Sequence, residues 1–136
     1  MSSGLQGRIQ AFLNGSPHAV VGASNDRSKY GNKVLRCYLQ TGREAFPVNP
    51  SGGQIEGLVA YPDLASLRQP VHGVSIITPP RVTERIVEDA HRAGIKHLWM
   101  QPGAESAAAV KRAEALGMSV IAGGACILVV LGFGEH

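Results

Sequence analysis

The chain has 136 residues, of which 44% are hydrophobic and 17% are charged, and this size predicts one domain over residues 1–136. No run of about 18 or more apolar residues occurs, so no membrane-spanning helix is expected. The first residues, Met1 to Gly4, lack the basic and apolar stretches of a secretory signal. The two cysteines, Cys37 and Cys126, lie far apart, which is typical of a reducing compartment. We therefore expect a cytoplasmic protein without a membrane partner.

The net charge is +3, from 13 lysines and arginines against 10 acids, and its position along the chain is more informative than its size. The segment from Gly22 to Arg36 carries the whole excess, and the rest of the chain is neutral. Four cations and one acid make up this excess: Arg27, Lys29, Lys33 and Arg36, with Asp26. A nucleic-acid-binding protein usually carries a larger excess along a stripe, so we expect no nucleic-acid partner. The charge instead predicts a local anion site.

Strands and helices alternate along the predicted fold. Amphipathic stripes predict the helices, and runs that are apolar at successive positions predict strands covered on both faces. Three helices stop at Gly42, Gly94 and Gly117, shortly before the next strand begins. The expected elements, in chain order, are a helix over Leu5–Leu13, a strand over Ala19–Ala23, a helix from Val34 to about Thr41, a strand over Ala45–Val48, a loop over Ser51–Leu58, a short helix over Tyr61–Leu67, a strand over Val74–Thr78, a helix over Val82–Ala93, a strand over His97–Gln101, a helix over Ala107–Leu116 and a strand over Ser119–Ala122.

This alternation predicts an α/β fold of three layers, a Rossmann-like domain with a five-stranded parallel sheet in the order 3-2-1-4-5. In that order the loop after strand 1 lies beside the loop after strand 4, at the carboxyl edge of the sheet where such folds bind ligands. The polar side of the helix over Val82–Ala93, which includes Arg85, is interpreted as a solvated face. The apolar tail, Cys126–Phe133, fits a short buried helix, an edge strand or the contact of a homodimer.

The loop after the first strand is the main candidate for phosphate binding, because it follows a strand and opens a helix. Gly22 would permit a tight turn, and Gly31 would let the backbone approach a ligand closely. The two serines could donate hydroxyl hydrogen bonds, and the basic side chains could neutralise phosphate charge. The spacing is not G-x-G-x-x-G, and a solvated basic loop is the alternative. The candidate residues are Gly22, Ala23, Ser24, Arg27, Ser28, Lys29, Tyr30, Gly31 and Asn32.

Three other loops add candidate residues at the same edge. Val48, Asn49 and Pro50 end the second strand without the acid that holds the ribose of NAD, which disfavours an ordinary dinucleotide site; a simple turn is the alternative. A ribose that carries a 3′-phosphate would have no use for that acid. After the third strand, Thr78, Pro79 and Pro80 could form an apolar wall for an adenine. After the fourth, Gln101 and Gly103 could orient a ligand.

An ordered set of segments resembles the CoA-binding domain family, both its small stand-alone members and the nucleotide-binding domain of the succinyl-CoA synthetase alpha subunit. The set spans about residues 18 to 127, which is nearly the whole chain. Its pieces are Val21-Gly22-Ala23-Ser24 with the basic loop into Tyr30-Gly31, then Pro47-Val48-Asn49-Pro50, Tyr61-Pro62-Asp63-Leu64, Thr78-Pro79-Pro80, Trp99-Met100-Gln101-Pro102-Gly103 and Cys126.

The resemblance implies coenzyme A as the ligand and no catalytic residue. It implies that the pyrophosphate lies on the loop Gly22–Gly31 and the adenosine near Val48–Pro50 and Thr78–Pro80, with Gln101 and Gly103 on the pantetheine side. The sequence departs from the family in its wholly apolar tail after Cys126 and in the residues Gly123-Gly124-Ala125 before it. The phosphorylated histidine of the synthetase belongs to a second domain that does not match this chain.

Other chemistry finds little support in the residues. His18, His72, His91, His97 and His136 show no metal-ligand spacing, so no metal site is expected. Cys126 is interpreted as a small buried hydrophobe, with reaction toward a CoA thiol or disulfide regulation as the alternatives. We expect a small module that binds CoA or an acyl-CoA without catalysis of its own. The alternatives are a subunit of an acyl-CoA ligase that needs a partner chain, and an NAD(P)-binding regulator.

Overall fold

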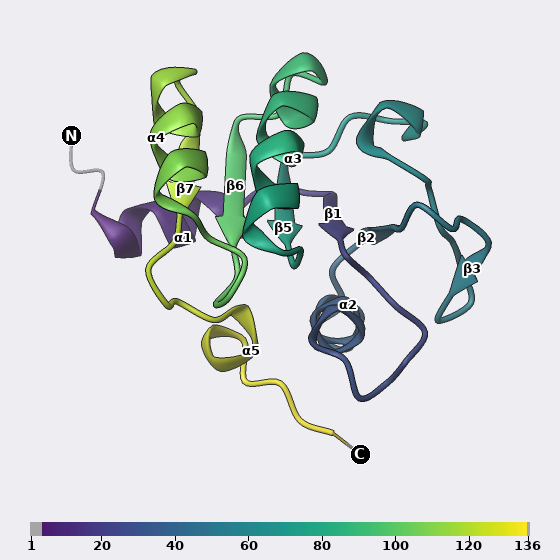
Figure 1. Cartoon of the computed structure of the whole chain (residues 1–136). Helices are drawn as coiled ribbons and strands as arrows, with labels where there is room; N and C mark the ends of the chain where they lie inside the picture. The colour runs from purple at the N-terminus through teal and green to yellow at the C-terminus, as the bar shows by residue number, and fades with distance from the viewer. Residues whose placement is uncertain (1–3, 136) are drawn as a thin grey trace.

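The computed structural model describes residues 4–135 and places five strands in one parallel sheet (Figure 1). The prediction that no secretory signal is present involves Met1 to Ser3, and the prediction of no metal site involves His136. These four residues lie outside the described residues. The strands of this sheet are β1 (His18–Val21), β2 (Ala45–Val48), β5 (Gly73–Ile76), β6 (His97–Met100) and β7 (Ser119–Ile121). No described helix is long and apolar enough to cross a membrane.

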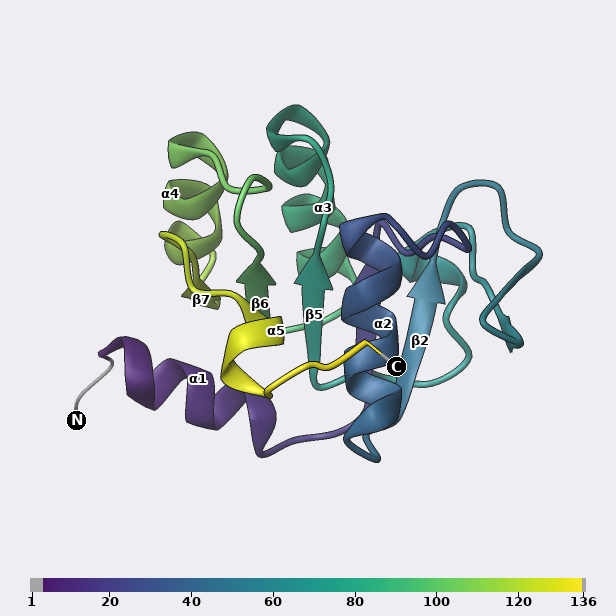
Figure 2. The same cartoon turned by 90° about the horizontal axis from the view of Figure 1, so that it is seen from below.

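Helices cover both faces of this sheet, which gives the expected three layers of a Rossmann-like α/β fold (Figures 1 and 2). One face packs against α3 (Pro80–Arg92) and α4 (Ala107–Ala115), and the other against α1 (Leu5–Leu13), α2 (Tyr30–Gln40) and α5 (Ile127–Val130). Successive strand residues alternate between the two cores, because strand side chains point to opposite faces in turn. Leu98 and Met100 of β6 pack toward α3 and α4, whereas Trp99 packs toward α1.

The order of the strands is β2-β1-β5-β6-β7, all parallel. Counted along the chain this is 2-1-3-4-5, which differs from the expected 3-2-1-4-5 in the place of one strand: β5 pairs with β1 and not with β2. The outer edge of β2 is already occupied. Pro47 has no N–H to donate there, its carbonyl accepts from the N–H of Tyr61 at 3.0 Å, and Val48 forms a bridge with Tyr61. The third strand therefore lies on the other side of β1.

This order decides which loops meet. Val21 of β1 lies opposite Val48 of β2 and Ile76 of β5, so these three strands end level with one another. The loop after β1 is thus flanked by the loops after β2 and β5, and the loop after β6 lies one strand further away. The point where the strand order reverses is the position at which open α/β sheets bind ligands.

Most element boundaries agree with the expectation, and the segment after β2 does not. The expected loop over Ser51–Leu58 contains a hairpin of β3 (Gln54–Ile55) and β4 (Leu58–Val59). Its turn residues, Glu56 and Gly57, both have positive φ, at 51° and 79°, as a two-residue turn between twisted strands requires. Glutamate is an unusual residue for that conformation, so the turn carries none of the common sequence signals.

Two further elements have other bounds than expected, and the apolar tail adopts one of the three conformations proposed for it. The short helix predicted over Tyr61–Leu67 is a single 3₁₀ turn, Leu64–Ser66, capped by Asp63, whose carboxylate accepts from the Ser66 N–H at 2.9 Å. Helix α2 begins at Tyr30, four residues before the predicted start. The apolar tail forms the short helix α5, in which Ile127 is buried.

Candidate functional site

Two glycines bring the end of β1 and the start of α2 into direct contact. Gly22 has a φ of 98°, and a Cβ atom there would lie 2.0 Å from the carbonyl oxygen of Ile77. A Cβ atom at Gly31 would lie 1.9 Å from the carbonyl oxygen of Gly22. The expected tight turn at Gly22 is therefore present. The close approach at Gly31, predicted to be toward a ligand, is made to the protein's own backbone, and it sets the position of helix α2.

The loop between these glycines is ordered by hydrogen bonds within itself. The Asp26 carboxylate accepts from both the N–H and the hydroxyl of Ser28, at 3.0 and 2.6 Å, and these bonds hold the pKa of Asp26 below its usual value. The hydroxyl oxygen of Ser24 accepts from the Asp26 N–H at 3.0 Å. Both serines that we predict as phosphate donors thus already shape the loop.

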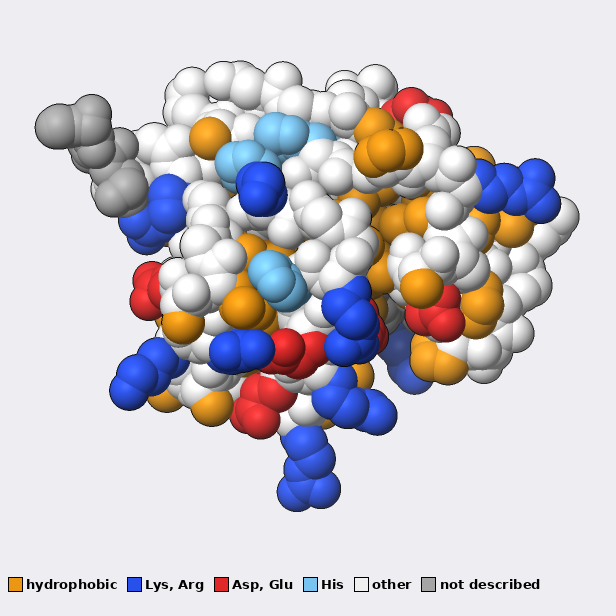
Figure 3. All heavy atoms as spheres, turned by 90° about the horizontal axis from the view of Figure 1, so that it is seen from above, with side chains coloured by type: hydrophobic (Ala, Val, Ile, Leu, Met, Phe, Trp, Pro, Cys, Tyr) orange, Lys and Arg blue, Asp and Glu red, His pale blue; other side chains and the backbone are white. Residues whose placement is uncertain are grey.

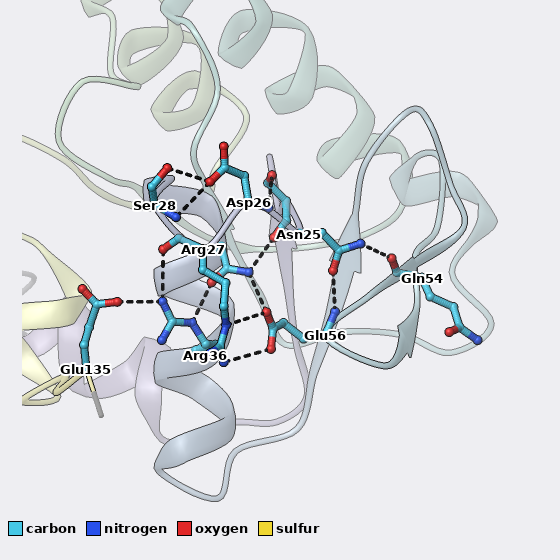
Figure 4. A network of polar contacts seen from close by, with 10 residues as sticks. Asn25, Asp26, Arg27, Ser28, Arg36, Gln54, Glu56 and Glu135 are labelled. Carbon is cyan, nitrogen blue, oxygen red and sulfur yellow. Dashed lines mark hydrogen bonds and ion pairs between the residues drawn. The ribbon is translucent and has the colours of Figure 1, made fainter.

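The basic residues of this segment are paired with carboxylates from distant parts of the chain (Figure 4). The guanidinium of Arg27 lies 3.2 Å from the Glu56 carboxylate at the tip of the β3–β4 hairpin. The buried side-chain amide of Asn32 donates to Glu56 at 2.8 Å and to the Ser24 carbonyl at 2.7 Å. These hydrogen bonds, first that of Asn32 and then that of Arg27, lower the pKa of Glu56.

A second carboxylate comes from the end of the chain. Glu135 lies 2.9 Å from Arg36 and 3.4 Å from Lys33, and the Arg36 guanidinium lies over the ring of Phe133 at 5.3 Å from its centroid. The local excess of positive charge is therefore mostly neutralised in the folded chain. Of the four cations in the segment, only Lys29 forms no ion pair with any residue in the range 4–135.

A cleft of about 510 Å³ opens where β1, β2 and β5 end and α3 begins. Four of the predicted ligand residues line it: Gly22, Val48, Pro50 and Thr78. The remaining lining residues come from the end of β1, from α3 and from the segment around the 3₁₀ turn: Val21, Pro62, Asp63, Leu64, Val82, Arg85, Ile86, Glu88, Asp89 and Arg92. On the face shown in Figure 3, apolar side chains are exposed in a hollow, and charged side chains gather nearby. Apolar walls with a few charged groups at the rim suit an adenosine.

The other predicted residues of the β2 and β5 loops support the walls of this cleft. The side-chain amide of Asn49 donates to the Ala23 carbonyl at 2.8 Å, which ties the β2 loop to the β1 loop. Pro79 precedes α3 and Pro80 is its first residue, so the two prolines set the direction in which this helix leaves the sheet. Neither proline lines the cleft.

Gln101 does not reach the cleft. Its side chain is fully buried, and its carbonyl oxygen accepts from the Tyr30 hydroxyl at 3.1 Å and from the Ile127 N–H at 3.0 Å. The Tyr30 oxygen lies 2.8 Å from the sulfur of Cys126, and burial and this contact raise the pKa of Tyr30. These groups join α2, β6 and α5, so Gln101 holds three elements together. Gly103 is exposed, with its N–H donating to Glu105 at 2.9 Å.

Sequence reasoning misses Arg85, Pro62 and Glu56. The polar pattern places Arg85 on a solvated face, yet that part of α3 forms one side of the cleft. The sequence alone does not reveal this, because the position of α3 beside the cleft follows from the order of the strands. No local signal connects Glu56 with Arg27, which lies 29 residues away in sequence.

Three histidines meet at the opposite edge of the sheet, although their spacing predicts no cluster. The rings of His72 and His97 stack at 4.3 Å, and the ring of His18 lies 5.8 Å from that of His72. His18 is fully buried, and its Nε2 lies 2.8 Å from the Phe12 carbonyl oxygen. Burial lowers the pKa of His18 to about 4. Among residues 4–135 no group of His, Cys, Asp and Glu has a geometry that could hold a metal ion.

The parallel sheet, the glycine turn after β1 and the apolar cleft at the reversal of strand order define a Rossmann-like ligand-binding domain. A family model described as a CoA binding domain matches residues 17–132. The chain therefore belongs to the CoA-binding domain family, and coenzyme A is the ligand of this family.

Curated relatives extend this assignment to enzymes that are much longer than this chain. The chain is 28% identical over 89 residues to the alpha subunit of acetate–CoA ligase (ADP-forming) II from Pyrococcus furiosus, covering 65% of this chain and 20% of that protein. It is 27% identical over 94 residues to the alpha subunit of acetate–CoA ligase (ADP-forming) I of the same organism, with the same coverage. The chain thus spans about a fifth of the length of these relatives.

Solved structures include proteins of similar length. A conserved hypothetical protein from Pyrococcus furiosus is 40% identical with a TM-score of 0.79, covering 83% of this chain and 97% of that one. A hypothetical protein from Pyrococcus horikoshii OT3 is 25% identical with a TM-score of 0.85, covering 95% and 89%. The dinucleotide-forming acetyl-coenzyme A synthetase 1 of Ca. Korarchaeum cryptofilum is 28% identical with a TM-score of 0.70, covering 82% of this chain and 27% of that one.

Proposed function

We propose that the chain is a small cytoplasmic module that binds CoA or an acyl-CoA, with residues 1–136 as one domain and no catalysis of its own. The observation that carries this proposal is the cleft of about 510 Å³ between the β1, β2 and β5 loops. Its apolar wall, which includes Val48, Pro50 and Leu64, suits an adenine ring. No acid follows β2 at Asn49-Pro50-Ser51, so the ribose can carry a 3′-phosphate without repulsion at that position.

The pyrophosphate of the ligand belongs over the loop from Gly22 to Gly31. Lys29 supports this placement, because its charge is exposed and unpaired among the described residues. The hydrogen bonds inside the loop hold it in one shape before a ligand arrives. A pre-ordered loop loses less conformational entropy on binding than a flexible one.

Isothermal titration calorimetry with CoA, acetyl-CoA, NAD and NADP tests this function. We expect one CoA per chain with an affinity in the micromolar range, and no heat with either nicotinamide nucleotide. Binding of NADP without a response to CoA would contradict the proposal and would support an NAD(P)-dependent regulator.

The second candidate function is that of a subunit in an ADP-forming acyl-CoA ligase. It is favoured by the names of the curated relatives, in which the matching region is part of an alpha subunit. Purification of the tagged chain from its native cells distinguishes the two functions. A stoichiometric partner chain, together with CoA- and ATP-dependent acyl-CoA formation by the complex, supports the ligase. A chain that purifies alone and retains CoA supports the module.

A further inference from the structure

Most of the charged side chains that line the cleft already have partners within the fold. Glu88 lies 2.7 Å from Arg112 of α4. Asp89 pairs with Arg92, one turn further along α3. Asp63 caps the 3₁₀ turn by accepting from the Ser66 N–H at 2.9 Å. These contacts fix three acids and one arginine of the cleft rim.

Arg85 is the exception among the charged residues that line the cleft. It is exposed on α3 and forms no ion pair or side-chain hydrogen bond with any residue in the range 4–135. Its natural partners on the same helix, three and four residues further on, are Glu88 and Asp89. Both already form ion pairs with other arginines, so neither competes with a ligand in the cleft for the guanidinium of Arg85.

The cations of the β1 loop do not serve this part of the site. Arg27 is paired with Glu56, Lys33 and Arg36 are paired with Glu135, and none of the three lines the cleft. Lys29 is unpaired but lies in the loop, outside the cleft lining. Within the described part of the chain, a ligand whose adenosine occupies the cleft thus meets one available cation there, and it is Arg85.

CoA carries anionic charge at two places, the pyrophosphate and a phosphate monoester on the 3′-oxygen of the ribose. Two separate anions call for two separate sets of donors. A guanidinium can bind a phosphate monoester through two parallel N–H···O hydrogen bonds, a geometry that lysine cannot provide. Helix α3 begins at Pro80, beside the edge where the cleft opens, so the positive end of its dipole favours an anion there.

We propose that Arg85 binds the 3′-phosphate of CoA and so distinguishes CoA from dephospho-CoA, which lacks this group. This inference rests on the proposed CoA-binding function. It assigns the pyrophosphate and the 3′-phosphate to different segments: the first to the β1 loop with Lys29, and the second to α3.

Calorimetric titration of the whole chain with CoA and with dephospho-CoA tests the assignment. Wild type binds CoA more tightly than dephospho-CoA. Arg85→Gln lowers the affinity for CoA about tenfold and leaves that for dephospho-CoA unchanged, because a charge-assisted hydrogen bond contributes about that factor. Arg85→Lys retains the charge without the paired geometry and gives an intermediate loss for CoA only. Arg81→Gln is the matched control, since Arg81 is an exposed arginine of the same helix that does not line the cleft.

The outcomes separate this assignment from the function on which it rests. If the wild type binds both ligands equally well, or if Arg85→Gln weakens both equally, CoA binding stands and the assignment of the 3′-phosphate to Arg85 is overturned. An equal effect of Arg81→Gln on CoA also overturns it, because general charge would then explain the loss. If the wild type binds neither ligand, the proposed function itself fails.

Discussion

The two edges of the parallel sheet use polar residues in opposite ways. At the carboxyl edge, the loops are held by paired charges and side-chain hydrogen bonds, such as those of Glu56 with Arg27 and Asn32, beside an open cleft. At the amino edge, His18 is packed against Phe12 with a ring separation of 4.7 Å, and its Nδ1 is buried without a hydrogen-bond partner among the described residues.

The difference separates stability from binding. At the amino edge, the imidazoles act as aromatic packing groups that join α1 to the sheet, and burial keeps His18 neutral. At the carboxyl edge, the polar groups compensate one another inside the loops, so the loop shape is retained while Lys29 and Arg85 remain available. Changes at the first edge should therefore affect unfolding, and changes at the second should affect ligand affinity.

A substitution in the glycine turn at Gly22 should reduce both the stability of the fold and the affinity for the ligand. It gives the largest expected effect. Gly22→Ala adds a Cβ that meets the Ile77 carbonyl oxygen at 2.0 Å, at a φ of 98° that alanine rarely adopts. We expect a loss of about 4 kcal/mol in the free energy of unfolding, measured by urea denaturation, because the strain and the clash add.

Gly103→Ala is the control for this change. Gly103 has a similar φ of 94°, but a Cβ atom added there would meet no atom within 4 Å. It should lose only the contribution of the backbone strain, about 1 kcal/mol. Equal losses in the two variants would show that the contact between β1 and the β5 loop does not limit the fold.

The amino edge should make stability depend on pH. The pKa of His18 falls from its ordinary value of 6.5 to about 4 in the folded chain, so the unfolded chain binds the proton more readily. The contribution of neutral His18 to stability is complete above about pH 6.5, is lost as the pH decreases toward about 4, and changes no further below that. The full loss from this group is about 3 kcal/mol. Urea midpoints measured from about pH 7.5 down to about pH 4 check this dependence.

An exposed histidine provides the comparison for this pH dependence. His91→Gln, on the solvent side of α3, should leave the slope of stability against pH unchanged. CoA affinity at neutral pH should not change with His91→Gln either. A flat stability profile in the wild type would mean that His18 is solvated when protonated.

The smallest effect concerns paired and unpaired cations within one loop. Lys29→Ala should weaken CoA and dephospho-CoA alike, by about fivefold, because both ligands contain the pyrophosphate. Arg27→Ala should weaken both by less, since its exposed guanidinium is already engaged by Glu56. Calorimetry with both ligands measures the two variants side by side. If Lys29→Ala weakens the binding of CoA but not that of dephospho-CoA, the 3′-phosphate is bound by this loop and not by α3.

Local patterns predict the elements well, because the residues that decide them are neighbours in sequence. The helix Leu5–Leu13 and the turn at Gly22 follow from apolar spacing and from one glycine. The order of the strands could not be read in this way. Both orders have the same alternation of strands and helices, and the choice depends on Tyr61 closing the outer edge of β2.

The charges of the candidate site could likewise be predicted only in part. The excess between Gly22 and Arg36 is visible in the sequence, but its partners, Glu56 and Glu135, reach it only through the fold. Arg85 illustrates the reverse case. A polar helix face is consistent with solvent or with a cleft, and only the position of α3 at the reversal of strand order decides between them.

The pairing of Arg27 with Glu56 and of Arg36 with Glu135 has a consequence for the rate of ligand capture. A cation that already holds a carboxylate projects little field into solvent, so an approaching polyanion is only weakly steered toward the loop. The association rate should therefore respond weakly to ionic strength. The fit of the ligand in the cleft, and the time for which it stays there, then determine how tightly it is held.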